Sequence, residues 1–513
     1  MNQPTATPLR FSAFVMNTTS HILQGLWRTE EAQQTNFNSL EHWVSLAREL
    51  ERGKFDFIFF ADVTGLYGDY DGGYRKYVQA GLQIPSNDPS VIASAIAYNT
   101  TDLGIAITSS VLQDHPFNFA RKISTLDHAS GGRIAWNIVT NGLANASRNF
   151  GYDDLEEHDE RYVWADEYAD VVYKLWEGSW DDGALLADKE RGLHGDPSKV
   201  HKIFHEGKRY RVEGPHLVAP SPQRTPVLFQ AGSSPAGREF AARNAEAQFI
   251  ITPNPEAARL LVDDTRARLP RYGRDPHDLT FFQGLHFVIG STEEEARRKE
   301  AELEDNIDLD AMIAHLSGAI GIDFGSHPLD TPLGAIETEG IRSVLDWVRD
   351  SVDGREATIE DLGRLQGRNS RVVGTPEQIA DELQRWRDAG VDGINVVNAT
   401  IPGSYVEFID HVIPVLQQRG LAQSEYAPGN RARQTVRFRP AEPPTSGGEV
   451  SRRLRRGHRG SVTTQAPAPS DDARREARQR RARWMNVGTT IVSTEAMMKI
   501  SMLSRMIGML PRK

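Results

Sequence analysis

Short apolar runs alternate with longer amphipathic stretches along most of this chain, and this alternation limits the possible folds more than any other feature. Strands separated by helices pair in parallel, because each helix returns the chain to the same end of the sheet. Eight such units favour an α/β fold of the (β/α)₈ TIM-barrel type over about residues 9–420, with a doubly wound open sheet as the alternative. The predicted strands are residues 9–16, 55–60, 103–109, 133–139, 226–231, 247–252, 281–289 and 391–397.

Two stretches interrupt the alternation and are predicted to be insertions. Residues 178–225 contain KIFHEGKRYRVEG, which is typical of a small β-hairpin, and residues 308–370 are rich in Gly, Asp and His. The Gly- and Tyr-rich loop at residues 64–87 is long enough to be functional rather than a simple connection. We therefore expect a barrel domain over residues 1–426, with both insertions as lids over a ligand, followed by a low-order extension over residues 427–513.

The net charge of −11 is unevenly distributed. Residues 421–513 hold 19 Lys and Arg against 7 Asp and Glu, which leaves 40 basic and 63 acidic residues in residues 1–420. The acidic body argues against nucleic-acid binding through its general field. The Arg-rich, apolar-poor extension is predicted to be disordered except for a short amphipathic helix at residues 495–510. We interpret it as a divergent or read-through tail, with a nucleic-acid or membrane-surface tail as the alternative.

Several classes of site are missing from the sequence. Cysteine is absent, so disulfides, thiolate metal sites and cysteine nucleophiles are excluded. There is no Rossmann glycine fingerprint, P-loop or HExxH motif, and His201 and His205 lie in the hairpin-like insertion, where their spacing does not put them on one face. We expect no metal site. Without a secretory leader or a run of about 18 apolar residues, a soluble cytoplasmic protein is expected.

Polar side chains directly follow several predicted strands. The carboxyl ends of parallel barrel strands meet at one face, where ligands bind. Asp62, Thr108 and Asn141 stand at the ends of the second, third and fourth strands. Ser233 and Ser234 follow the fifth strand in GSSPAG, where the opening of a helix presents backbone N–H groups to an anion. Each residue alone also fits a cap or a filler of the barrel, but together they predict one site with a phosphate group at GSSPAG.

The stretch from residue 131 to residue 176 is the most specific part of the chain. It reads GGRIAWNIVTN, then a polar loop that leads into HDERY, whose first and last residues are His158 and Tyr162, and then a helix that opens with ADEY. This pattern resembles the nitrilotriacetate monooxygenase and dibenzothiophene-sulfone monooxygenase family, whose members are FMN-dependent two-component monooxygenases of the bacterial-luciferase-like superfamily. The resemblance ends at GLAQSEYAPG, so it covers the barrel domain and not the extension.

The resemblance implies a reaction and its partners. A separate NAD(P)H:flavin reductase supplies reduced FMN, O₂ adds to it to give a flavin hydroperoxide, and a small organic substrate is oxygenated. Relatives are commonly dimers or tetramers, so a homo-oligomer is expected. Two alternatives are an F420-dependent oxidoreductase on the same fold and a non-catalytic flavin-binding protein.

Individual residues take candidate roles from their chemistry and position, and the resemblance implies which of them bind FMN. His158 is the candidate catalytic acid or base, with hydrogen bonding to the loop or the flavin as its alternative role. His21, Trp27 and His115 are candidates to face the substrate. The residues expected to bind FMN are Ser233, Ser234 and Tyr162 at the phosphate, Asp62, Thr108 and Asn141 around the isoalloxazine, and His158 near the flavin.

Overall fold

Eight parallel strands close into a barrel. The computed structural model describes residues 7–68, 70–336, 355–368 and 370–427. Each barrel strand pairs in parallel with the next, and the last pairs with the first. Closure confirms the predicted (β/α)₈ barrel and rules out the doubly wound open sheet. In order around the barrel, the strands are β1 (Arg10–Met16), β2 (Phe57–Ala61), β3 (Gly104–Ser110), β4 (Ile134–Val139), β9 (Val227–Gln230), β10 (Ala247–Ile250), β11 (Thr280–Ile289) and β13 (Gly393–Val397).

Aromatic rings fill the barrel interior. Phe57 and Phe59 of β2 point inward, as alternate positions on a barrel strand do, and both meet the ring of Phe229 edge-on at 5.3 Å between centroids. Phe249 of β10 packs against Phe59 from another side. Because these rings occupy the middle of the barrel, a ligand can lie only at one of its mouths.

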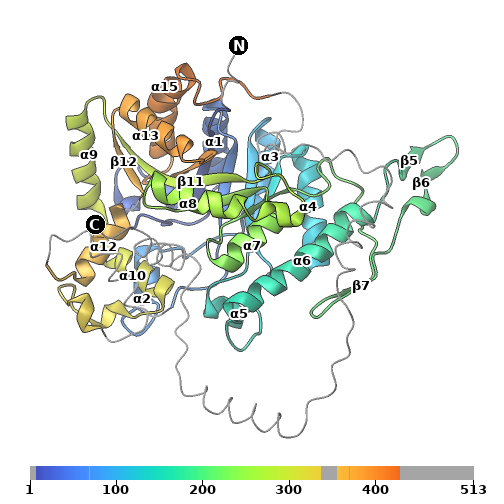
Figure 1. The fold of residues 1–513 in the computed structure, drawn as a ribbon, viewed down its shortest axis with the longest axis horizontal. Helices are drawn as coiled ribbons and strands as arrows, with labels where there is room; N and C mark the ends of the chain where they lie inside the picture. Colours follow the sequence, from blue (N-terminus) through green and yellow to red (C-terminus); the bar gives the residue numbers. More distant parts are fainter. Residues whose placement is uncertain (1–6, 69, 337–354, 369, 428–513) are drawn as a thin grey trace, which may run out of the picture.

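Helices surround the barrel and bury one apolar face each against the strands (Figure 1). Thr375 and Gln378 form the predicted capping box, in which the Thr375 N–H donates to Gln378 Oε1 at 2.9 Å. The surrounding helices are α1 (Leu40–Arg52), α3 (Pro89–Asn99), α4 (Pro116–Ser130), α6 (His158–Gly178), α7 (Pro235–Asn244), α8 (Pro255–Arg266), α9 (Glu293–Asn306), α13 (Pro376–Asp388), and α14 (Gly403–Glu407) continuing through a π-helical turn (Phe408–Val412) into α15 (Ile413–Gln418).

Three features differ from the sequence prediction or add to it. Helix α6 begins at His158, so His158 and Tyr162 lie in its first two turns and not in the preceding loop. That loop contains a short helix of its own, α5 (Ala144–Asn149). A further strand, β12 (Arg371–Gly374), pairs with the end of β11 outside the closed barrel.

The two insertions have different structures. Residues 178–225 form two hairpins, β5 (Leu185–Asp188) with β6 (Leu193–Gly195) and β7 (His205–Glu206) with β8 (Arg211–Val212), and the first projects from the body (Figure 1). Residues 308–370 contribute α10 (Leu309–Ile320) and α12 (Ile359–Arg368), which share a second apolar core with α2 (Arg75–Ala80). Short 3₁₀ turns complete the described part at Leu26–Arg28, Gln34–Asn36, Pro197–Lys199, Leu269–Tyr272, Phe324–Ser326 and Leu333–Ala335.

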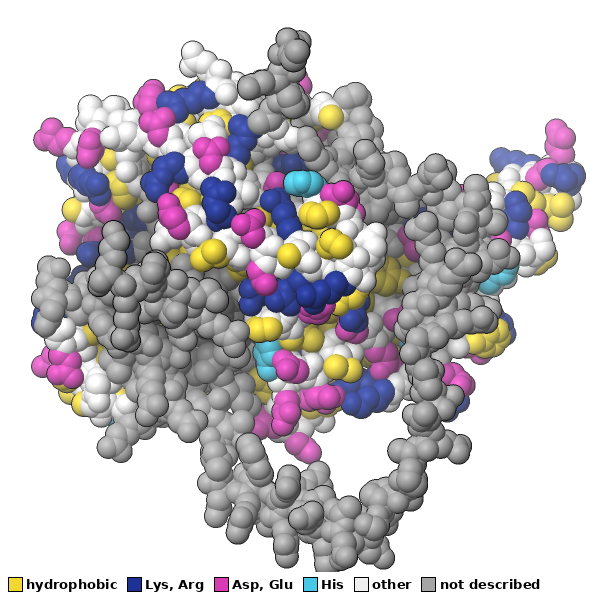
Figure 2. Space-filling model, viewed as in Figure 1, with side chains coloured by type: hydrophobic (Ala, Val, Ile, Leu, Met, Phe, Trp, Pro, Cys, Tyr) yellow, Lys and Arg dark blue, Asp and Glu magenta, His cyan; other side chains and the backbone are white. Residues whose placement is uncertain are grey.

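The C-terminal extension, including the predicted helix at residues 495–510, lies outside the described residues, apart from its first residue, Ala427. Within the part of the chain that is described, no helix is long and apolar enough to cross a membrane. On the face shown in Figure 2, acidic and basic side chains alternate over the described surface.

Candidate active site

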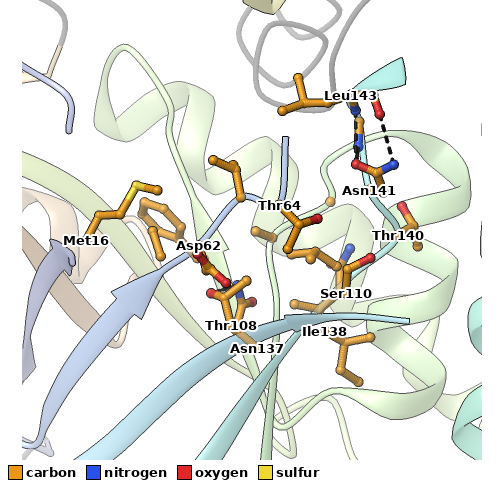
Figure 3. Close-up of a pocket in the computed structure, with 18 of the residues that line it drawn as sticks. Met16, Asp62, Thr64, Thr108, Ser110, Asn137, Ile138, Thr140, Asn141 and Leu143 are labelled. Atoms are coloured by element: carbon orange, nitrogen blue, oxygen red, sulfur yellow. Dashed lines mark hydrogen bonds between the residues drawn. The ribbon is translucent and has the colours of Figure 1, made fainter. Parts of the chain in front are cut away.

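A cavity opens at the C-terminal mouth of the barrel (Figure 3). Parallel strands end together at this mouth, so residues far apart in sequence meet there. The wall is mostly apolar, and a few polar groups are set into it, as is usual for small-molecule and cofactor sites. The described residues that line it are Phe14, Met16, His21, Phe59, Ala61, Asp62, Val63, Thr64, Tyr67, Gln83, Thr108, Ser110, Gln113, Asn137, Ile138, Val139, Thr140, Asn141, Gly142, Leu143, Tyr162, Gln230, Ala231, Gly232, Phe249 and Ile251.

Three neighbouring strands bring together a polar cluster on one side of this cavity (Figure 3). Asp62 follows β2, Thr108 lies on β3, and Asn137 lies directly opposite Thr108 on β4. The Asn137 amide donates from Nδ2 to Thr108 Oγ1 at 2.9 Å, while its buried Oδ1 has no hydrogen-bond partner among the described residues. A buried acceptor without a partner is costly, so Asn137 Oδ1 is placed to accept a hydrogen bond from a ligand.

The Asp62 carboxyl is the strongly perturbed acid of the cavity. Its pKa is raised from 3.8 to about 7, with burial as the largest cause and repulsion from Asp88 as the second. Hydrogen bonds from the Val63 N–H and from Gln113 Nε2, which lies 3.5 Å from Asp62 Oδ2, oppose the rise only in part. A carboxyl with this pKa can hold or release a proton near neutral pH.

Tyr162 reaches the cavity from the second turn of α6, at the side where α7 begins. Its buried hydroxyl interacts with Ser234, Gln230 and Thr140, and burial raises its pKa. Two glycines make this approach possible: a Cβ on Gly232 would lie 2.3 Å from the Tyr162 hydroxyl, and a Cβ on Gly237 would lie 2.8 Å from it. The peptide of Gly232 is fixed by Gln248 Nε2, which donates to its carbonyl at 2.8 Å.

The two predicted serines lie beside this point but do not line the cavity. Ser234 is the N-cap of α7, and its Oγ accepts the Gly237 N–H at 3.1 Å. Ser233 is buried, and its Oγ has no hydrogen-bond partner among the described residues. The start of α7 therefore combines a committed capping hydroxyl, on Ser234, with an uncommitted one, on Ser233.

His158 lies behind Tyr162 rather than in the wall of the cavity. Its ring meets the Tyr162 ring edge-on at 5.2 Å between centroids, and its Nδ1 lies 2.8 Å from Asp159 Oδ1. The buried Nε2 has no hydrogen-bond partner among the described residues. His158 thus contacts a cavity residue without facing the cavity itself.

Asn141 lines the rim, but its side chain is used by its own loop. Its backbone φ of 62° lies in the left-handed region, which Asn tolerates because its side chain bonds the local backbone. Asn141 Oδ1 accepts the N–H groups of Gly142 and Leu143, and Nδ2 donates to the Leu143 carbonyl and to Ser147 Oγ (Figure 3). The buried Arg161 donates to the Asn141 carbonyl. Asn141 therefore shapes the rim.

Of the seven predicted site residues, Asp62, Thr108, Asn141 and Tyr162 line the cavity, and His158, Ser233 and Ser234 stand next to it. Among the three candidates for the substrate side, His21 lines the cavity. The Trp27 indole instead donates to the Ala80 carbonyl at 3.2 Å, and His115 caps α4 by accepting the Phe117 N–H at 3.3 Å.

Sequence reasoning missed several residues that line the cavity. Asn137 was detectable as the one polar residue in the buried run IAWNIV. Tyr67 and Gln83 come from the long loop that was predicted to be functional, and Gln83 adopts a φ of 52° that the sequence does not reveal. Non-glycine residues in this conformation cluster at functional sites.

Metal-ligating side chains do not gather in the described part of the chain, where no three His, Asp or Glu residues could hold an ion. His201 lies 2.9 Å from Asp181, whereas His205 lies between Glu167 and Asp170 on α6. The two histidines therefore contact different partners.

A closed parallel barrel with a polar-edged cavity at its C-terminal mouth places this chain among the TIM-barrel enzymes. The model of the luciferase-like monooxygenase family matches residues 16–393, and the chain belongs to this family. It is 43% identical to the long-chain alkane monooxygenase of Geobacillus thermodenitrificans, over 82% of this chain and 92% of the relative. It is 42% identical to the dimethyl-sulfide monooxygenase of Hyphomicrobium sulfonivorans, over 83% and 89%.

The nitrilotriacetate monooxygenase component A of Aminobacter aminovorans is 33% identical, over 79% of this chain and 92% of the relative. A crystal structure of a long-chain alkane monooxygenase superimposes with a TM-score of 0.78 at 41% identity, over 85% and 97% of the two chains. The structure of a riboflavin lyase with modified FMN and riboflavin superimposes with a TM-score of 0.75 at 34% identity, over 84% and 96%. The chain is therefore a monooxygenase, in preference to an F420-dependent oxidoreductase or a non-catalytic flavin-binding protein.

Proposed function

We propose that this monooxygenase binds reduced FMN delivered by a separate NAD(P)H:flavin reductase and uses O₂ to oxygenate a small organic substrate. The observation that carries the proposal is the cavity itself, with a polar cluster on three strand ends and a glycine-lined approach to Tyr162 at the start of α7. A relative from Pseudomonas putida, 28% identical, is named an FMNH₂-dependent dimethylsulfone monooxygenase. The reductase is proposed because one relative is named as a component A.

The start of α7 fits a phosphate group. A phosphate needs several donors and a close approach of the backbone, and helix N-termini supply both. Here Gly232 and Gly237 keep the backbone clear of side chains, Ser233 Oγ lacks a partner, and the Tyr162 hydroxyl lies at the same point. We assign Ser233, Ser234 and Tyr162 to the phosphate, with His158 supporting the Tyr162 ring.

The polar cluster fits the edge of a flavin ring. Phe59 and Ile138 give the cavity flat apolar surface, while Thr108, Asn137 and Asp62 present hydrogen-bonding groups along one side. When bound, reduced FMN supplies the electrons for oxygen activation. Asp62, rather than His158, is then the group placed to hold or accept a proton inside the cavity, because it lines the wall and its pKa is about 7.

The second insertion supports a loop that lines the cavity and so helps to exclude water. Tyr67 lines the cavity and packs on α10, where a Cβ on Gly318 would fall 2.3 Å from the Tyr67 Cβ. Close packing of this loop against α10 shields the site, which oxygen chemistry requires if reduced cofactor is not to be wasted. The first insertion packs against Glu167 of α6 and, like the second, contributes no residue to the described cavity lining.

The test is an anaerobic titration of the full-length protein with reduced FMN, in which binding is monitored by the tryptophan fluorescence of the protein. Saturable binding is expected, with reduced riboflavin about 100-fold weaker because it lacks the phosphate. Asn137→Leu should weaken reduced FMN about tenfold, whereas Asn118→Leu, an exposed position on α4, should leave it unchanged. Oxygen uptake with purified reductase and candidate substrates follows. Equal affinity for FMN and riboflavin would refute the phosphate assignment.

We also propose that residues 1–426 form the monooxygenase domain and that residues 427–513 are an addition to it. The alkane monooxygenase relative is matched over 92% of its own length by 82% of this chain. A homo-oligomer, dimer or tetramer, and a cytoplasmic location stay predictions, which sedimentation and cell fractionation can check.

A further inference from the structure

We propose that the molecule oxygenated in this cavity is neutral and largely apolar and carries no carboxylate group, an inference that rests on the proposed function. The names of the relatives do not decide this point, because their substrates differ in charge. The composition of the cavity wall does. Its apolar part includes Phe14 and Met16 of β1, Phe249 of β10, Ile251 just beyond β10, and Leu143 from the loop after β4.

The described lining of the cavity contains neither lysine nor arginine. His21 is its one basic side chain, and the His21 ring packs against the Phe14 ring at 4.7 Å between centroids. Three cations stand close to the cavity without lining it. Lys76 lies 2.7 Å from Asp310, Lys122 lies 2.6 Å from Asp114, and the buried Arg161 is directed at the Asn141 carbonyl, to which it donates.

A carboxylate that entered this wall would lose its water without gaining a cation. Buried anions are found paired or hydrogen-bonded because an unpaired one is strongly disfavoured. It would also meet Asp62, whose own carboxyl already has its pKa raised by burial and by Asp88. A second anion in the same cavity would add like-charge repulsion to desolvation. The uncharged face of Met16, Phe249 and Ile251 instead suits alkyl, thioether or sulfone groups.

A matched set of thioethers tests the inference without turnover. Dipropyl sulfide, 3-(propylthio)propanoate and 3-(propylthio)propylamine share one skeleton and differ in terminal charge. Each is titrated calorimetrically into full-length protein loaded with reduced FMN, under anaerobic conditions. The sulfide is expected to bind about 100-fold more tightly than the acid. Equal affinities, tighter binding of the acid, or no saturable binding of the sulfide would overturn the proposal.

A charge placed in the wall provides the second arm. Ile251 is only partly buried, so Ile251→Lys can extend its ammonium toward the open side, and Ile251→Met is the matched uncharged control. The lysine variant should gain at least about tenfold in affinity for the acid, with the methionine variant unchanged. If the lysine leaves acid binding as it was, the missing cation is not what excludes carboxylates and the inference fails.

Affinity for reduced FMN separates this inference from the function on which it rests. A protein that does not bind reduced FMN refutes the proposed function. A protein that binds reduced FMN normally but prefers the acid refutes the neutral-substrate inference alone. For each variant, a melting temperature and a circular dichroism spectrum that match those of the wild type report that the barrel has folded.

Discussion

Replacement of Asp62 by asparagine should stabilise the protein, and the gain should depend on pH. Asp62 carries a carboxyl whose pKa is raised to about 7 by burial and by the neighbouring Asp88. Asparagine has nearly the same shape and can still accept the hydrogen bond from Gln113 Nε2, but it never carries the charge. The substitution therefore removes the penalty for ionising this position while leaving its packing in place.

The stability gain of Asp62→Asn should grow with pH because folding raises the pKa of the Asp62 carboxyl. A carboxyl with a higher pKa in the folded state loses stability as pH rises from the unfolded value near 4 to the folded value of about 7. A shift of about three units corresponds to about 4 kcal/mol. Water penetration and relaxation at a partly accessible site reduce the expected gain to about 2 kcal/mol at pH 8. At pH 4 the Asp62 carboxyl of the folded wild type is neutral, like the amide of the variant, and the gain in stability should nearly vanish.

The assay is urea unfolding of wild type and Asp62→Asn at pH 5, 6, 7 and 8, without cofactor. Asp153→Asn, an exposed carboxyl in the loop before α6, is the control and should show no comparable trend. Asp88→Asn should show a smaller gain, because Asp88 is the second cause of the shift and asparagine can still cap α3. A variant no more stable than wild type at pH 8, or a gain that does not grow with pH, would refute the assignment of a raised pKa.

Three further predictions concern the glycines beside Tyr162, the first insertion and the C-terminal extension. Gly232→Ala places a Cβ 2.3 Å from the Tyr162 hydroxyl and should weaken reduced-FMN binding at least about 100-fold, whereas Gly73→Ala, with open space around it, should not. Glu167 accepts the N–H groups of Arg209 and Tyr210 at 2.9 and 2.8 Å, so Glu167→Ala should lower the free energy of unfolding by about 2 kcal/mol. The control Glu160→Ala removes an exposed ion pair with Lys208 and should cost about 0–1 kcal/mol. Truncation after Ala427 should leave the melting temperature and turnover unchanged, whereas truncation after Glu425 removes Tyr426, whose hydroxyl donates to the Phe55 carbonyl at 2.7 Å, and should cost about 1–2 kcal/mol. Equal effects within any of the three matched pairs would contradict the structural reason given for that pair.

The barrel could be predicted from the sequence because its signals are local. Each of the eight strands is an apolar run bounded by polar or glycine residues, and helix starts such as Asp88-Pro89 and Thr375 to Gln378 are written in a few adjacent residues. The strand β12 was missed because it pairs outside the closed barrel, where its short run RVVG has no burial pattern of its own. Hydrophobic periodicity reports burial and not hydrogen bonding.

The sequence could show that the site lies at the ends of the strands, but it could not show which side chains there face the cavity. Asp62 and Thr108 follow from the rule that ligands lie at the carboxyl ends of barrel strands. Choosing between Asn137 and Asn141 needs the register of β4, which fixes which residue faces inward, and it also needs the left-handed turn that uses the Asn141 side chain locally. Neither is visible in a single sequence. His158 shows the same limit, since the start of α6 three residues before Arg161 puts its ring behind Tyr162.

The position of His158 behind Tyr162, rather than in the cavity wall, changes the chemistry that the site can perform. If His158 faced the cavity, its imidazole could exchange a proton with a bound ligand directly. With His158 behind Tyr162, Asp62 is the ionisable member of the polar cluster, and its pKa of about 7 depends on burial and on Asp88 rather than on an intrinsic property of the residue. Because the surroundings of Asp62 set its pKa, substitution of a neighbouring residue can change that pKa while Asp62 itself stays in place. Asp88→Asn should therefore shift the acid limb of a pH–activity profile to lower pH, whereas His158→Gln should lower reduced-FMN affinity and leave that limb in place. A limb that moves with His158 and not with Asp88 would return proton transfer to the histidine.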